Sequence, residues 1–525
     1  MTTLYSQIAM TAPHAEAAIA GQKILENGGT AIEAMVAAAA TISVVYPHMT
    51  GLGGDGFWLI HQPGKSPVAI DGSGYSANNL DCYQNLESVP ARGGKACITI
   101  AGAVSGWQKA LQWNEQNLTA SHTLDELFGP AIMAAEQGFS VSESLAECTK
   151  EKYLELHRVH GFAETFLVNQ NPLSAGNTFK QPKMANLLRL LTKNGLDDFY
   201  RGEVAKNISS ALISAGSSLC FNDFNDFEAQ FVSPLQVKLK GKTLFNLGAP
   251  TQGLASLLIL AQFDELYDPN MNEIESMHLI VEATKNAFVI RDKFITDAQK
   301  LKQPLESFLT SESIKKLCDT IDMDKAQPWP KQALLGDTVW MGARDQNGVM
   351  VSYIQSLYWE FGSGVVIPEY GLVWNNRGIS FSLDSEHHNS LEPRKKPLHT
   401  LNPALCIFDD DRRLAYGTMG GEGQPQTQAA IYHRIVNLQQ TPEKAIAEPR
   451  WLLGRTWGDL SNNLKIEQSL FNRIGQDFHN IGHDVQCVPD LSEMMGHAGV
   501  IYERQDKVLA GTDPRSDGLA IVKDL

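Results

Sequence analysis

The sequence has few positive charges for its length and no long apolar run. Its 43 lysines and arginines are outnumbered by 59 aspartates and glutamates, which gives a net charge of −16. A nucleic acid or an anionic membrane would require a basic surface, and the densest basic cluster, 394–396, is short. The longest apolar run, 34–46, is too short to span a bilayer. We therefore expect no nucleic-acid partner and no membrane partner.

Cysteine is also sparse. Seven cysteines are scattered over 525 residues without a Cys-x-x-Cys pair, which predicts reduced thiols and not a disulfide framework. Residues 1–13 have neither a basic start nor a sustained apolar core, so no secretory signal is expected there. Together these features predict a cytoplasmic location.

Common cofactor and catalytic motifs are missing. The sequence contains no Gly-x-Ser-x-Gly, no His-Glu-x-x-His and no P-loop, and His387-His388 has no ligand partners at the usual spacing. Residues 51–56 formally match Gly-x-Gly-x-x-Gly, but a strand-like run follows them, whereas a dinucleotide site requires a helix there. We expect a sharp turn instead, with its backbone close to an active site, and neither a cofactor nor a metal.

The remaining composition is that of a soluble protein with a large core, since 43% of the residues are hydrophobic and 19% are charged. Helices are predicted at 15–25, at 30–40, where Thr30 and Glu33 have the spacing of a capping box, and at 124–138, 142–157, 186–193, 203–215, 253–266, 277–294, 311–322 and 427–437. Strands are predicted at 57–61, 66–72, 97–101, around the turn within 235–247, and at 338–343, 349–357, 364–367, 371–375, 404–408 and 413–418. Helical segments from both halves would cover the resulting sheet, which predicts a layered α/β sandwich.

Thr338 opens one of these strands. Two β-rich runs flank the turn signal Gln346-Asn347-Gly348, so they predict a hairpin. If the chain were cut before Thr338, the new α-amine could act as base for the threonine hydroxyl. Such an amine titrates at about pH 7.7–8.0. On this stretch alone, the favoured interpretation is that Thr338 is one β-branched residue that starts a strand, because Asp-Thr is a common dipeptide.

Motifs along nearly the whole chain favour Thr338 as a nucleophile over an ordinary strand residue. They are Asn27-Gly28-Gly29-Thr30-Ala31, residues 51–57, 99–106 and 198–202, Thr338 to Gly348, Phe361-Gly362-Ser363-Gly364, Asn375-Asn376, residues 397–403, Met419-Gly420-Gly421 and Asp513-Pro514-Arg515. In this order they resemble the γ-glutamyltranspeptidase family of the N-terminal-nucleophile hydrolases. The resemblance implies an α/β (α+β) fold, a four-layer αββα sandwich.

The resemblance also implies maturation by self-cleavage between Asp337 and Thr338. The products would be a large, helix-rich subunit, 1–337, and a small subunit, 338–525, which interleave in one fold as a heterodimer. A dimer of heterodimers remains an open alternative. Thr338 would then be the nucleophile.

Three further catalytic residues are implied by the same resemblance. Ser356 matches a hydroxyl residue that orients the nucleophile, and Gly420 and Gly421 match a pair of backbone amides that hold the oxyanion.

The substrate-binding positions depart from the family pattern. Ser73 stands where transpeptidases have an arginine for the glutamate carboxylate, and Ser380 stands in the stretch that supplies an aspartate for the amine. His399-Thr400 replaces a Ser-Ser pair. We therefore expect a glutamyl head group to lack both charge partners.

New groups accompany these losses, namely Arg377, His399 and Tyr358. Arg377 or a protonated His399 could pair with a single carboxylate near the scissile amide. Alternatively, Arg377 is a turn residue that pairs with Asp384 or Glu386.

The motif combination resembles a cytoplasmic branch of the family that includes oxamate amidohydrolases and glutaryl-type acylases. It implies an amidohydrolase for a small amide that bears a carboxylate, with oxamate converted to oxalate and ammonia through an acyl-Thr338 intermediate. The alternative is a γ-glutamyl hydrolase or transpeptidase for glutathione-like compounds. An uncleaved binding module is disfavoured because Thr338, Ser356 and the glycine pair are intact.

Overall fold

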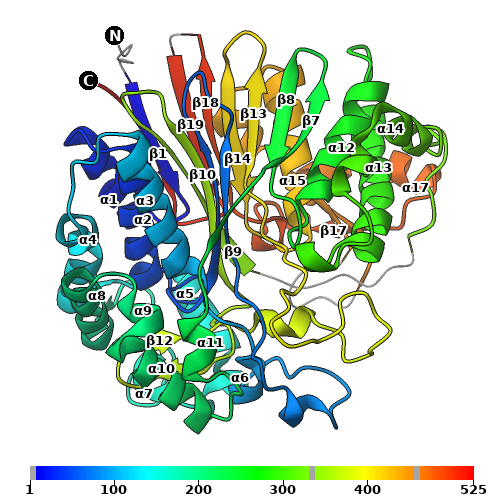
Figure 1. Ribbon diagram of the computed structural model, residues 1–525. Coiled ribbons are helices and arrows are strands. Elements are labelled where there is room, and N and C mark those ends of the chain that lie inside the picture. Colours follow the sequence, from blue (N-terminus) through cyan, green and yellow to red (C-terminus); the bar gives the residue numbers. More distant parts are fainter. Residues whose placement is uncertain (1–6, 330–336, 455–460, 506) are drawn as a thin grey trace.

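Two antiparallel sheets face each other in the computed structural model, which describes residues 7–329, 337–454, 461–505 and 507–525 (Figure 1). The first sheet has the order β20 (Leu519–Asp524), β1 (Gln7–Ala12), β9 (Asp337–Arg344), β10 (Met350–Tyr358), β2 (Asp55–His61), β3 (Val68–Gly72) and β6 (Gln230–Val232). The second has the order β19 (Lys507–Thr512), β18 (Ala498–Arg504), β14 (Arg413–Thr418), β13 (Ala404–Phe408), β8 (Lys242–Asn246) and β7 (Leu235–Leu239).

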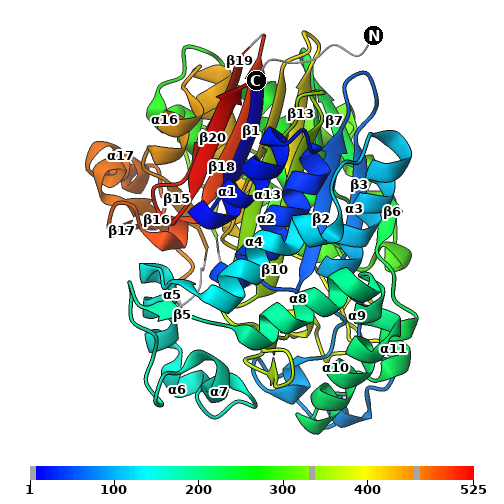
Figure 2. The same cartoon turned by 90° about the vertical axis from the view of Figure 1, so that its left-hand side faces the viewer.

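A helical layer covers the outer face of each sheet, as Figures 1 and 2 show. The first sheet packs against α1 (Ala15–Glu26), α2 (Ala31–Val45) and α3 (Ala103–Asn117). The second packs against α12 (Gly253–Leu266), α13 (Glu273–Phe294) and α15 (Gly423–Tyr432). The predicted four-layer αββα sandwich is confirmed.

The remaining elements surround these layers. The helices are α4 (Leu124–Gln137), α5 (Glu143–Glu151), α6 (Tyr153–Leu156), α7 (Phe162–Phe166), α8 (Pro182–Asn194), α9 (Asp198–Arg201), α10 (Glu203–Ser214), α11 (Phe221–Asn225), α14 (Ser311–Cys318), α16 (Pro442–Ala447) and α17 (Gln468–Asn480). The short strands are β4 (Phe139–Ser140), β5 (Thr178–Phe179), β11 (Val366–Ile367), β12 (Leu372–Val373), β15 (Trp451–Leu453), β16 (Leu464–Glu467) and β17 (Val485–Val488). Within the described ranges, no helix combines the length and the apolar surface needed to cross a membrane.

Trp340 fills the space between the sheets. It belongs to an apolar cluster with residues of both sheets, including Phe57 and Ile501. Its ring lies over bare backbone, because a Cβ at Gly417 would come within 2.1 Å of Trp340 Cδ1 and one at Gly499 within 2.5 Å of Cζ3. This packing anchors β9 next to the second sheet, and thereby positions the residues at its start.

Segments from both sides of the Asp337–Thr338 bond alternate in the first sheet. β1 lies between β20 and β9, and β2 pairs with β10. The hairpin predicted around residues 346–348 is present as β9 and β10. A cut before Thr338 would therefore leave two chains that share one sheet.

Some predicted elements were wrong. Residues 97–101 form no strand and make only an isolated bridge, Ser76 to Thr99. Side chains bond this segment instead: Trp374 Nε1 donates to the Thr99 carbonyl, and the Thr99 hydroxyl donates to Asn375. A segment satisfied in this way needs no strand partner.

Other predictions were wrong in their bounds. The helix at 142–157 divides at Lys152 into α5 and α6, the helix predicted from 427 begins at Gly423, and the strands at 364–367 and 371–375 shrink to two residues each.

Candidate active site

Three neighbouring strands bring the predicted catalytic residues to one end of the first sheet. Asp337 of β9 pairs with Tyr358 of β10, and Ser356 of β10 pairs with Asp55 of β2. Thr338, the second residue of β9, is 1% exposed. The starts of β9 and β2 therefore meet at the end of β10, and Thr338 lies in a buried setting.

The end of β10 is irregular where it passes Thr338. The strand register shifts between Gln355 and Tyr358, and Tyr358 has a φ of +86°, which is rare for a residue with a side chain. The Tyr358 amide donates to the Ser356 hydroxyl at 2.7 Å. Such backbone strain gathers at functional sites. The orienting role of Ser356 stays a prediction.

Gly420 and Gly421 connect β14 to α15 in left-handed conformations, with φ values of +115° and +51°. Within the described part of the chain, neither of their amides donates a hydrogen bond. Two free amides can stabilise an oxyanion, at about 2.7–4 kcal/mol per donor in comparable sites. The geometry agrees with the predicted role, which stays a prediction.

Two glutamines that the sequence analysis missed connect these parts. Gln424 Nε2 lies 3.5 Å from Thr338 Oγ1. Gln252 Nε2 donates to the carbonyl of Thr400 at 2.6 Å and to that of Gly421 at 2.8 Å. Gln252 thus places the 400 segment beside the glycine pair. No sequence motif marks either glutamine, because the partners of each lie far away in the chain.

Arg377 is a buried cation beside this arrangement. It is 1% exposed, and its guanidinium carbon lies 3.6 Å from the centre of the Tyr358 ring. Its Nη1 lies 3.4 Å from the Thr400 hydroxyl, at the outer limit of a hydrogen bond, whereas Nε and Nη2 have no partner among the described residues. The predicted alternative, a pair with Asp384 or Glu386, does not occur in this part of the structure.

The charge of Arg377 persists at neutral pH. Burial lowers its pKa to about 10, so it remains protonated. A buried charge is costly unless it is paired. The two unpartnered nitrogens therefore indicate a place for an anion.

His399 is fully buried and lies with its Nε2 3.0 Å from Asp55 Oδ2. Burial lowers the pKa of His399 well below its usual value, and Arg377 and Lys396 lower it further. Burial also raises the pKa of Asp55 to about 7. The neutral ring is therefore the favoured form, which makes a protonated His399 the weaker of the two predicted cations.

Ser73 and Ser380, which stand where transpeptidases have charged residues, bring no charge to the site. The Ser73 hydroxyl and amide both donate to Asp71 Oδ1, at 2.5 and 2.8 Å, while Lys396 donates to Oδ2. Ser380 is the last residue of a short helical turn that begins at Arg377. The Ser380 side chain contacts Tyr358. Substrate binding by Ser73, Ser380, Thr400 and Tyr358 stays a prediction.

One group of metal-type ligands lies elsewhere, which the sequence analysis did not expect. His278, Glu282 and His483 gather near α13 within the described ranges. Their polar atoms already bond one another and the protein: His278 Nδ1 lies 2.8 Å from His483 Nε2, and Lys285 donates to Glu282 at 2.6 Å. The Lys285 ammonium supplies the positive charge that a metal would bring.

Prolonged chelation is expected to leave turnover unchanged. The reason is chemical, since a threonine with its own amine as base needs no Lewis acid. The measurement is the hydrolysis rate before and after dialysis against EDTA, with a mock dialysis as control. Loss of activity that one particular metal restores would contradict this expectation.

Comparisons with known proteins agree on a single family. The family model described as gamma-glutamyltranspeptidase matches residues 17–522. The oxamate amidohydrolase proenzyme of Klebsiella pneumoniae is 46% identical over 97% of both chains. The glutathione hydrolase-like YwrD proenzyme of Bacillus subtilis is 37% identical over 98% of both chains. The crystal structure of a cephalosporin acylase from Bacillus halodurans covers 99% of this chain and 96% of its own, with 28% identity and a TM-score of 0.89.

Proposed function

Because this chain belongs to the γ-glutamyltranspeptidase family and is an enzyme of the N-terminal-nucleophile hydrolase type, we propose that it hydrolyses a small amide that carries a carboxylate next to the scissile carbonyl. Oxamate is the substrate that we put first, with oxalate and ammonia as products. The relative named for that activity, at 46% identity, supports this choice.

The observation that carries the proposal is the incomplete hydrogen bonding of the buried Arg377 guanidinium. Its Nε and Nη2 have no partner among the described residues, although the side chain is 1% exposed. Arginine is well suited to a carboxylate because two of its N–H groups can bond both oxygens. The ring on which it stacks belongs to Tyr358, which pairs with Asp337 beside the nucleophile. A carboxylate on Arg377 would thus lie near Thr338, which favours a short substrate.

Maturation would use the same hydroxyl as turnover. Thr338 Oγ1 attacks the carbonyl of Asp337, the peptide nitrogen becomes the α-amine, and water then hydrolyses the ester. The products are subunits 1–337 and 338–525, which stay together as a heterodimer because their strands share one sheet. The names of the two relatives as proenzymes support this step.

In each turnover the Thr338 amine would accept the hydroxyl proton as Oγ1 attacks the amide. The amides of Gly420 and Gly421 would hold the developing oxyanion. The protonated α-amine then gives this proton to the amide nitrogen, which leaves as ammonia when the C–N bond breaks, and water hydrolyses the acyl-Thr338 ester. All seven cysteines are free thiols, which supports a reducing, cytoplasmic setting.

Steady-state kinetics on oxamate, a glutaryl amide and γ-glutamyl anilide would test this proposal. We expect kcat/KM for oxamate to exceed that for the anilide by at least ~100-fold, the ratio expected from one charged contact of ~3 kcal/mol. The glutamyl amine would find no carboxylate at Ser380, and an unpaired buried charge is costly.

The same experiment separates the alternatives. A preference for the glutaryl amide would keep the amidohydrolase but lengthen its substrate. A preference for γ-glutamyl anilide would overturn the proposal in favour of a γ-glutamyl hydrolase or transpeptidase.

A further inference from the structure

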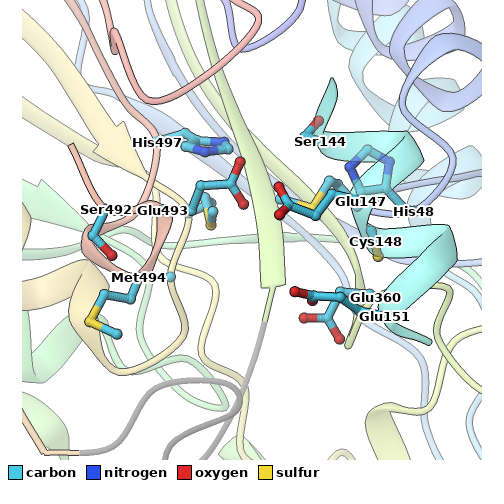
Figure 3. Close-up of a pocket in the computed structure, with 13 residues that line it drawn as sticks. His48, Ser144, Glu147, Cys148, Glu151, Glu360, Ser492, Glu493, Met494 and His497 are labelled. Carbon is cyan, nitrogen blue, oxygen red and sulfur yellow. The ribbon is translucent and has the colours of Figure 1, made fainter. Parts of the chain in front are cut away.

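A cavity of about 300 Å³, which Gly420 helps to line, extends beyond the groups that the proposed hydrolysis of oxamate uses (Figure 3). Four carboxylates contribute to its lining: Glu147 and Glu151 of α5, Glu360, and Glu493. The three at 147, 151 and 493 are exposed, whereas Glu360 is buried.

The cavity is built directly against the segment of the candidate oxyanion amides. The Met419 amide donates to the carbonyl of His497 at 3.1 Å, and a Cβ at Gly420 would lie 3.4 Å from Gly496 Cα. A group held in the cavity would therefore lie next to the scissile bond of a substrate whose carbonyl oxygen faces Gly420.

Two buried histidines in the lining have no partners. His48 and His497 are each 2% exposed, and all four of their ring nitrogens are unbonded within the described structure. Figure 3 shows both rings among the side chains that line the cavity. Burial lowers the pKa of His497 to about 4 and that of His48 well below its usual value. The neutral rings each offer one acceptor nitrogen.

Positive charge is scarce around these groups. The described lining contains neither lysine nor arginine. Among the four carboxylates, Glu360 has cations nearby, Lys152 at 3.5 Å and Arg92 at 3.9 Å, and its Oε1 has no hydrogen-bond partner among the described residues. Arg450 lies near His497, since it donates to the Gly496 carbonyl at 2.8 Å, and it adds to the effect of burial in lowering the pKa of His497. Arg450 is paired with Asp513.

Among the described residues, no lysine or arginine forms an ion pair with Glu493. Its pKa is raised to about 7 by burial and by the carboxylates of Glu147, Asp517 and Glu151. Much of the Glu493 side chain is nevertheless exposed to solvent, so we place it at the mouth of the cavity. There its charge is unfavourable next to the glutamates of α5. Acceptors on buried rings and acidic groups at the mouth together favour an ammonium ligand.

We propose that this cavity binds a primary alkylammonium group that belongs to the amine half of the amide substrate. A metal ion fits less well, because the cavity groups do not converge as ligands; the group of three within 4.8 Å in the described residues lies at His278, Glu282 and His483. The cavity is roughly ten times the ~30 Å³ of one water molecule, so it has room for a chain of several carbons. The inference rests on the proposed function for the acyl half only: it keeps the oxamyl group but replaces the amino group of oxamate with an aminoalkylamino group, so a diamine would leave in place of ammonia.

Calorimetry with 1,4-diaminobutane on the mature enzyme would test the site without turnover. We expect binding that butane-1,4-diol does not reproduce, and that weakens about five- to tenfold in each of Glu147→Gln and Glu493→Gln. Glu143→Gln is the matched control, since Glu143 is exposed on the same helix but does not line the cavity. Equal binding by the diol, no binding of the diamine, or equal effects of all three variants would overturn the proposal. Displacement of the diamine by Mn²⁺ would overturn it in favour of a metal site.

Turnover gives a second readout. We expect kcat/KM for N-(4-aminobutyl)oxamate to exceed that for N-(4-hydroxybutyl)oxamate at least ~10-fold, and the two carboxylate variants to remove this preference. If the diamine binds but no oxamate is hydrolysed, the proposed acyl half is wrong and the ammonium site stands. If both oxamates are hydrolysed equally well, the acyl half stands and the ammonium site is wrong.

Discussion

Replacement of Thr338 by alanine is expected to leave a single chain of 57.6 kDa without amidase activity. The hydroxyl of Thr338 is the group proposed to attack both the Asp337 carbonyl and the substrate, so one substitution removes both reactions. The expected loss is several orders of magnitude, because the acyl-enzyme route is removed entirely. A denaturing gel and an oxamate assay measure the two effects.

Thr338→Ser is the matched control. It keeps a hydroxyl and would keep the α-amine, so two bands and a measurable rate are expected. The substitution removes the methyl group of Thr338 from a packed site, since Thr338 is 1% exposed. We therefore expect a slower reaction. Two bands from Thr338→Ala would show that another group or another protein makes the cut.

Replacement of Arg377 by methionine is expected to lower kcat/KM for oxamate by about 100-fold or more, with maturation intact. The substitution removes the charge but keeps an apolar side chain against the ring of Tyr358. The loss corresponds to ~3 kcal/mol for a charged contact with the substrate carboxylate. Since a buried unpaired cation is itself costly, the free enzyme should not lose stability. Steady-state kinetics and a thermal melt measure the two quantities.

Arg412→Met is the control for the loss of a stacked arginine. The Arg412 guanidinium carbon lies 4.3 Å from the centre of the Phe408 ring. The guanidinium group forms an ion pair with Asp410, away from the residues of the candidate site. The substitution should leave kcat/KM unchanged. An Arg377→Met enzyme with normal oxamate kinetics would exclude Arg377 as the carboxylate partner and return attention to His399.

The sequence alone predicted the layered fold, and family motifs along the chain marked Thr338 as the candidate nucleophile. The fold prediction depends on local signals: the Asn-Gly turn after β9, the capping residues Thr30 and Glu33 of α2, and the alternation of strand residues. The predicted capping box is present, with both of its hydrogen bonds. Local signals of this kind survive without knowledge of distant contacts. They failed at 97–101, where side chains from far along the chain bond the backbone in place of a strand: Ser217 donates to the Cys97 carbonyl and Trp374 to the Thr99 carbonyl.

Only the tertiary structure decided the electrostatics of the site. In the sequence, Arg377 could pair with Asp384 or contact a ligand, and His399 could carry a charge. Burial separates these alternatives, because it leaves Arg377 charged and without a full set of partners, and it favours the neutral form of His399. Burial and partnership depend on which segments meet in space, and the segments that meet here, around residues 55, 252, 338 and 420, lie far apart in the chain.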